Sequence, residues 1–103
     1  MAFFRGGRER GGAAASDAAL RRALHAVLDH DLAGAETALS ETLRRDSSQI
    51  DAYLALASVY RQRGELGRAI HLHQNLLLRR DLGPAERFQA LLGLADDFRE
   101  GGF

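Results

Sequence analysis

The sequence contains an internal repeat that is present in two copies. The stretch from Asp29 to Asp46 aligns with the stretch from Arg63 to Asp81 when Ala35 is placed on Ala69. We call the number of residues between these two aligned positions the repeat offset. Both copies carry apolar residues three and four positions apart, the period of an amphipathic helix, and both end in Arg-Arg-Asp. A repeat length of roughly 20–50 residues is typical of architectures in which similar units stack on their neighbours. The repeat therefore predicts successive helical hairpins.

Five short helices follow from this periodicity and from the residues that interrupt it. The first is expected to begin at Ser16 or Asp17, the second after "DHDLAG", and the third after "RRDSSQ". The fourth follows Gly64, and the fifth begins at Pro84 and stops at residues 101–102, which are both glycine. β-Branched residues never alternate over the length of a strand, so the predicted class is all-α.

Residues 1–15 ("MAFFRGGRERGGAAA") have no such period. Their glycines and arginines indicate a disordered tail. Alternatively, Phe3 and Phe4 followed by Arg5 match the flank of a membrane segment that would lie upstream of this chain. Both interpretations stay open, and the folded domain is expected over residues 16–103.

Composition excludes several classes of function. The chain has a formal net charge of +0 and no Cys, so neither a strongly basic nucleic-acid surface nor a thiolate site is expected. Arginine pairs occur at 21–22, 44–45 and 79–80, but Asp46 and Asp81 adjoin two of them and no aromatic platform accompanies them.

Catalysis is not expected either. Asp96, Asp97 and Glu41 are predicted to lie on helix surfaces with no convergent partner and no nucleophile beside a base. His71 and His73 are two residues apart, about 200° round a helix, so they cannot bind one metal ion together. We expect His73 to face the core and His71 to face solvent, and we expect no cofactor or metal.

The third and fourth expected helices carry Tyr53, Leu56, Ala57, Tyr60, Gly64 and Ala69, and the spacing of these residues resembles that of the tetratricopeptide family. That family's first helix carries an aromatic residue, then Leu-Gly, then Tyr, and its second helix carries a small residue and then an aromatic one. The resemblance implies an α-α superhelix of about two and a half repeats, over residues 16–49, 50–83 and, for the first helix of a third, 84–101. The residues expected to pack the repeats together are Ala35, Tyr53, Leu56, Ala57, Tyr60, Gly64, Ala69, His73 and Phe98.

In such repeats the first helix of each pair lines an inner groove. An apolar row, with polar side chains beside it, suits a peptide or helix of a protein partner. Alternatively, further repeats or a second copy of the chain cover these residues. The subclass that grips a C-terminal carboxylate through Lys and Asn is not matched, because the chain has no Lys. The expected groove residues are Leu20, Leu24, Val27, Asp51, Leu54, Ser58, Arg61, Gln62, Gln89, Leu92, Asp96 and Arg99.

A narrower resemblance covers residues 17–103. The runs "RQRGELGRAIHLHQNLL" and "AERFQALLGLADDFREGGF" are similar to the N-terminal repeats of the lipopolysaccharide assembly protein B family. The matching residues are 63–65, 68–70 and 73–74. The resemblance implies cytoplasmic repeats behind a membrane anchor in the inner membrane. The resemblance also implies that these repeats act as an adaptor, which brings the deacetylase of lipid A synthesis to a membrane-bound AAA protease.

Members of that family continue through further repeats to a Cys-based metal domain, so we expect this chain to be a fragment. Leu91, Leu94 and Phe98 on the last helix would then be exposed and would promote a homodimer. A generic interaction module of another bacterial assembly or secretion system is the competing hypothesis.

Overall fold

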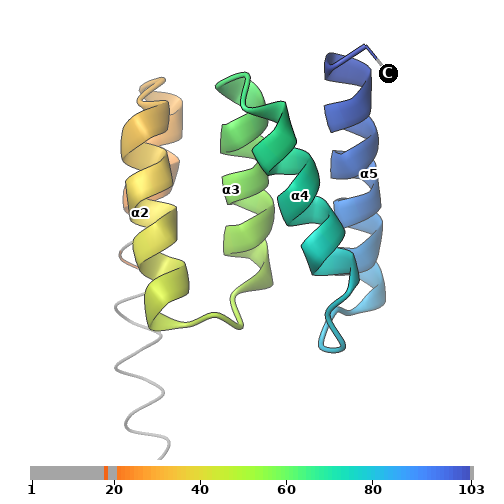
Figure 1. Cartoon of the computed structure of the whole chain (residues 1–103). Helices are drawn as coiled ribbons and strands as arrows, with labels where there is room; N and C mark the ends of the chain where they lie inside the picture. Colours follow the sequence, from red (N-terminus) through yellow and green to blue (C-terminus); the bar gives the residue numbers. More distant parts are fainter. Residues whose placement is uncertain (1–17, 19–20, 103) are drawn as a thin grey trace, which may run out of the picture. The chain divides into compact units, whose positions relative to one another are not determined.

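The computed structural model describes residue 18 and residues 21–102, and their regular structure is entirely α-helical (Figure 1). The all-α prediction is confirmed. The expected tail and the expected first cap, at Ser16 or Asp17, lie outside the described residues. The chain divides into two compact units, residues 1–49 and residues 50–103, which are described separately. The helices are residues 21–28, α2 (Leu32–Arg45), α3 (Ile50–Gln62), α4 (Leu66–Leu77) and α5 (Pro84–Glu100).

The turn after residues 21–28 and the turn after α3 have the same geometry, shifted by the repeat offset. Each passes through a left-handed residue, His30 with φ 60° and Gly64 with φ 80°. Glycine adopts this conformation without a steric cost, and histidine is among the residues that tolerate it. Three backbone hydrogen bonds close the first turn: Asp29 N to His25 O, His30 N to Val27 O and Asp31 N to Ala26 O. The same three bonds close the second turn: Arg63 N to Val59 O, Gly64 N to Arg61 O and Glu65 N to Tyr60 O. The repeat predicted from the sequence is therefore present in the backbone of both units.

The end of α5 repeats part of this turn. Gly101 N donates to Asp97 O and Gly102 N donates to Arg99 O, and Gly102 has φ 79°. These bonds are equivalent to those of the turn at Gly64 when Gly102 is placed on Gly64. This second offset is longer than the repeat offset, so the chain between Gly64 and Gly102 contains an insertion relative to the chain between His30 and Gly64.

The second unit has its core among α3, α4 and α5. Each of these helices contacts the other two (Figure 1). Burying a side chain the size of Leu76 contributes about 1.5–3 kcal/mol. Ala57 and Ala69, the predicted small packing positions, are fully buried and allow α3 and α4 to approach closely. The core cluster consists of Ile50, Leu76, Leu82 and Ala90, with Tyr53, Leu54 and Leu77 packed against it.

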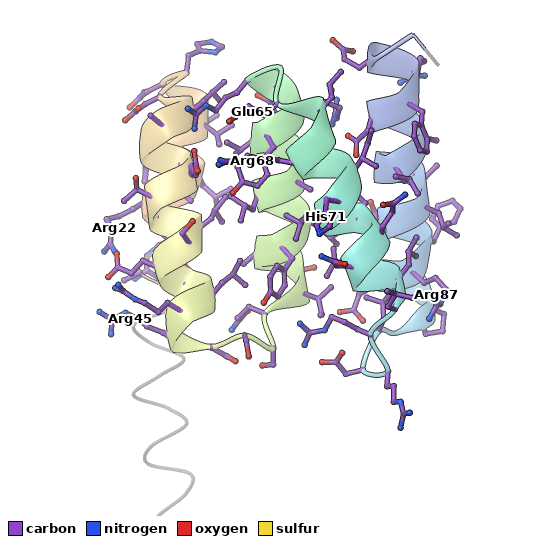
Figure 2. All side chains as sticks on the ribbon, viewed as in Figure 1. Arg22, Arg45, Glu65, Arg68, His71 and Arg87 are labelled. Carbon is purple, nitrogen blue, oxygen red and sulfur yellow. The ribbon has the colours of Figure 1, made fainter. Side chains whose placement is uncertain are left out.

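α5 is attached to α4 at its beginning. Pro84 occupies the first turn, where the missing N–H has no intrahelical partner, as predicted. Gly83 N donates to Glu86 Oε1 at 2.9 Å. Arg87 reaches back to the end of α4 and donates to the carbonyl of Leu77 at 3.3 Å (Figure 2). These bonds fix where α5 starts.

The side of α5 that docks is not its most apolar side. The residues fully buried on α5 are Ala90 and Asp97, whereas Phe88 is 59% exposed. Phe98, predicted to pack between repeats, keeps 37% of its surface exposed because the buried side of the helix is the one with small residues. Small side chains let two helices approach closely. In α5, this close approach outweighs the burial of its large apolar side chains.

Candidate functional site

A depression of about 260 Å³ lies where α3, α4 and α5 meet, and we refer to it as the α3–α5 groove. Its size is near the lower end of pockets that hold small molecules, so it suits one or two side chains of a partner. Most of its lining was predicted from the sequence. The groove is lined by Leu54, Ser58 and Arg61 of α3, His73 of α4, and Gln89, Leu92, Gly93 and Asp96 of α5.

The remaining expected groove residues have different positions. Gln62 donates to Ser58 Oγ at 3.1 Å, and Arg99 forms an ion pair with Asp96 at 2.5 Å, so both lie next to lining residues. Asp51 is exposed in the first turn of α3. Leu24 is 56% exposed and belongs to the first unit, as does half-buried Val27, and Leu20 lies outside the described residues.

A buried charged cluster lies beneath the groove. Asp97 of α5 is fully buried, and one of its oxygens, Oδ2, is 2.5 Å from Nδ1 of His73. Its other oxygen, Oδ1, is 3.4 Å from Nε of Arg61. The carboxylate of Asp97 therefore joins α4 and α3 to α5. A buried charge is tolerated only when such partners compensate it.

The expectation that Asp97 lies on the surface without a convergent partner was wrong. That expectation assumed that the polar residues of α5 lie on its exposed side. Instead, the helix docks through Ala90, Gly93 and Asp97, which share one face at spacings of three and four residues. Asp96, one position earlier, remains at the groove rim.

Gly93 makes the cluster possible. A Cβ atom on this residue would lie 2.3 Å from Nε2 and 2.7 Å from Cε1 of His73. Ordinary contacts of a Cβ atom begin at about 3.4 Å. Only glycine therefore leaves room for the ring of His73 between α4 and α5.

Arg61 connects the buried cluster with the groove. Its Nε is buried against Asp97, while 27% of its side chain stays exposed. Its terminal nitrogen NH2 is 3.5 Å from Ser58 Oγ, which is a long and weak contact. The guanidinium therefore has one edge in an ion pair with Asp97, without a hydrogen bond, and donors left for a bound molecule.

This polar cluster is not required by the repeat itself. One repeat offset earlier in the sequence, Val27 occupies the position equivalent to Arg61, and Leu39 occupies the position equivalent to His73. With the longer offset that places Gly102 on Gly64, Asp97 corresponds to Val59. Replacing a buried ion pair by apolar residues is often neutral or stabilising. The cluster therefore calls for an explanation other than packing.

The two neighbouring histidines differ as predicted. His73 is buried, whereas His71, which is labelled in Figure 2, is exposed on the opposite side of α4. Among the residues that the structure describes, no group of three or more His, Asp or Glu side chains is arranged to hold a metal ion.

His73 is oriented by a carboxylate, as a catalytic base often is. The nearest hydroxyl in the groove belongs to Ser58, and its described hydrogen bonds come from Arg61 and Gln62 of its own helix. Within the described residues, the groove therefore has a base without an activated nucleophile.

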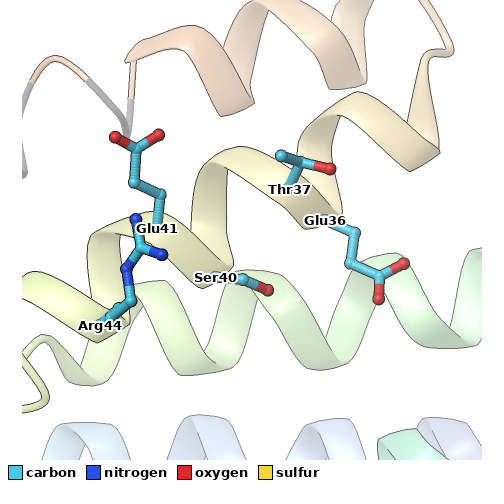
Figure 3. Close-up of a pocket in the computed structure, with 5 residues that line it drawn as sticks. All are labelled: Glu36, Thr37, Ser40, Glu41 and Arg44. Atoms are coloured by element: carbon cyan, nitrogen blue, oxygen red, sulfur yellow. The ribbon is translucent and has the colours of Figure 1, made fainter.

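A second depression, of about 400 Å³, lies on α2 (Figure 3). Its carboxylates, Glu36 and Glu41, point away from one another in the figure. Glu41 pairs with Arg45 at 3.2 Å and with Arg22 at 3.0 Å, and both arginines lie on the same side of the first unit (Figure 2). The hydrogen bond from Arg45, with help from the charge of Arg22, lowers the pKa of Glu41. This surface is an exposed ion-pair network, and its carboxylates do not converge on a substrate.

The arginine pairs at the helix ends are also engaged. Arg79 forms two hydrogen bonds to Asp81, at 2.8 and 2.7 Å, and lies over the ring of Tyr53. The bond from Arg79 lowers the pKa of Asp81. Arg22 and Arg45 share Glu41. One arginine of each pair is therefore balanced by a nearby carboxylate.

Comparison with known proteins supports one of the two resemblances. The chain is similar to lipopolysaccharide assembly protein B. It is 34% identical over 62 residues to that protein from Escherichia coli K12, and to the same protein from strains O6:H1 and O157:H7. The similarity covers 60% of this chain and 16% of each relative. The chain therefore spans a small part of these relatives' length.

No family model matches the chain, and no solved structure matches it. None of the helices in residue 18 and residues 21–102 has the length and apolarity needed to span a membrane.

Proposed function

We propose that this chain is a non-catalytic adaptor that holds a peptide or helix of a protein partner in the α3–α5 groove. The observation that carries the proposal is that side chains expected to face a partner line one depression, with Leu92 47% exposed in it. Apolar and hydrogen-bonding side chains at one surface suit a peptide ligand.

We also propose that the helical hairpins are tetratricopeptide units. Three observations support this: the repeat offset, which matches the length of a tetratricopeptide unit, the repeated turn at His30 and Gly64, and the burial of Ala35, Ala57 and Ala69.

The similarity to lipopolysaccharide assembly protein B supports a role in lipopolysaccharide assembly. On this proposal the partners are the deacetylase of lipid A synthesis and a membrane-bound AAA protease, which the adaptor brings together. The full-length protein would act on the cytoplasmic side, tethered to the inner membrane, as the Phe-Phe-Arg sequence at residues 3–5 suggests. An interaction module of another assembly or secretion system is the alternative.

The outer side of α5 supports a second mode of association. Phe88 and Leu91 are 59% and 50% exposed, and Phe98 lies on the same helix. We propose that this surface forms a homodimer, because neighbouring exposed apolar side chains are typical of an interface.

The adaptor proposal can be tested by calorimetric titration of the purified deacetylase with the chain. Leu92→Gln should weaken binding by about tenfold or more, because a polar side chain is placed in an apolar contact. Leu78→Gln is the matched control, since Leu78 is 81% exposed and lies outside the groove. Failure of the wild-type chain to bind the deacetylase favours the alternative system, and equal effects of the two variants contradict the groove.

A further inference from the structure

We propose that Arg61 recognises a carboxylate side chain, Asp or Glu, of the bound protein partner, and that Asp97 and His73 are positioning residues for it. This inference rests on the proposed peptide-binding function of the α3–α5 groove. It specifies the chemistry of the partner at that site.

The geometry of Arg61 is the first argument. Its Nε forms an ion pair, without a hydrogen bond, 3.4 Å from the buried oxygen Oδ1 of Asp97, and its side chain is 27% exposed where it lines the groove. A guanidinium presents its donors in a rigid plane, which matches the two oxygens of a carboxylate. Fixing one edge orients the remaining donors before a ligand arrives, which reduces the entropy lost on binding.

The cost of the cluster is the second argument. Asp97 is fully buried, and its partner His73 is 3% exposed, so both have lost their hydration. One repeat earlier, the residue equivalent to Asp97 is Val59 and the residue equivalent to His73 is Leu39, and both are apolar. A buried polar cluster at these positions is therefore better explained by what it does for Arg61.

The charges around the groove form the third argument. Asp96 at the rim is paired with Arg99 at 2.5 Å, so its charge is balanced by a residue of its own helix. His73 contacts one oxygen of Asp97, Oδ2, and Arg61 contacts the other, Oδ1, so the two residues share the carboxylate. The groove thus offers a held cation next to the apolar surface of Leu54 and Leu92. It fits a peptide that has an acidic residue close to an apolar one.

The test uses random peptides displayed on phage and selected against the 103-residue chain. Selected sequences are synthesised with acetylated and amidated ends, each in a Glu form and a matched Gln form, and their affinities are measured by fluorescence anisotropy. We expect selected peptides to contain Asp or Glu, and we expect the Gln forms to bind about tenfold more weakly.

Variants separate the roles of the residues. Arg61→Gln should bind the Glu and Gln forms equally, whereas Arg80→Gln, which removes an exposed arginine outside the groove, should keep the preference. His73→Leu combined with Asp97→Val places at both positions the apolar residues found one repeat earlier and leaves Arg61 without its buried partner, so its folding is checked by circular dichroism. This variant should lose at least half of the preference for the Glu form and shift the Nε–Hε resonance of Arg61.

Three outcomes would overturn the inference. One is a wild-type chain that binds Glu and Gln forms equally, and another is a preference that survives in Arg61→Gln. The third is a preference for the Glu forms that the variant with both His73→Leu and Asp97→Val retains in full. If Leu92→Gln leaves all peptide binding intact, or if no peptide is selected, the groove itself fails, and the proposed function fails with it.

Discussion

Replacing Gly93 by alanine should destabilise the protein, although alanine is the better helix former. The new Cβ atom would lie 2.3 Å from Nε2 of His73, so the ring must move by about 1 Å to reach an ordinary contact. That ring is held at 2.5 Å by Asp97, and moving it weakens the main compensation of a buried carboxylate.

Three contributions set the magnitude. Overpacking costs about 1–3 kcal/mol, and weakening a buried pair adds part of the roughly 3–5 kcal/mol that complete loss would cost. Gly→Ala in a helix returns up to about 1 kcal/mol. We therefore expect a net loss of about 2 kcal/mol or more in the free energy of unfolding.

The assay is urea denaturation followed by far-ultraviolet circular dichroism at neutral pH. Gly67→Ala is the matched control, because Gly67 also lies in a helix but a Cβ atom there would meet no atom within 4 Å. It should be neutral or stabilise by up to about 1 kcal/mol. If Gly93→Ala is as stable as Gly67→Ala, then His73 does not occupy the space next to Gly93 and the proposed cluster is incorrect.

Three further predictions follow from other parts of the chain. Ala69→Leu should lower the free energy of unfolding by about 1–3 kcal/mol, because Ala69 is fully buried, and an unchanged thermal midpoint would argue against the register of α3 and α4. The pKa of Asp46 is lowered in the folded state by hydrogen bonds from Ser48 and Gln49, so its stabilisation is complete above its ordinary pKa of about 4 and is lost as the pH falls further. Asp46→Asn should therefore cost about 0.5–1 kcal/mol at neutral pH and less at pH values below about 3, and a cost independent of pH in urea titrations would refute this assignment. Leu91→Glu should shift any dimer to monomer in light scattering at high protein concentration, while Leu78→Glu should not, and a wild-type chain that is monomeric throughout would rule out the α5 interface.

Much of the fold could be predicted because the repeat has strong local signals. Gly64 and Pro84 mark a helix end and a helix start for reasons of backbone conformation alone, and the structure places them there. His73 and His71 were assigned to opposite sides of α4 from helical geometry, and their burial agrees. These predictions depend on neighbours in sequence, which a single chain displays directly.

The charged cluster was missed because it depends on contacts between distant residues. Asp97 and His73 are 24 residues apart, and Arg61 lies on a third helix. A signal was nevertheless present: Asp97 occupies the position of Val59, and His73 occupies the position of Leu39. Asp97 and His73 are polar at positions that are apolar one repeat earlier, which indicates that the two side chains form a buried pair. Gly93 within a helix was a further sign of close approach.

The central claim is that a partner binds in the α3–α5 groove, and nuclear magnetic resonance tests it most directly. Amide and methyl resonances of the labelled chain can be followed while unlabelled deacetylase is added. The account predicts that the largest changes fall on Ser58, Arg61, Gln89 and Leu92, from both walls of the groove. Changes confined to the outer side of α5 or to α2, with these four residues unaffected, would contradict it.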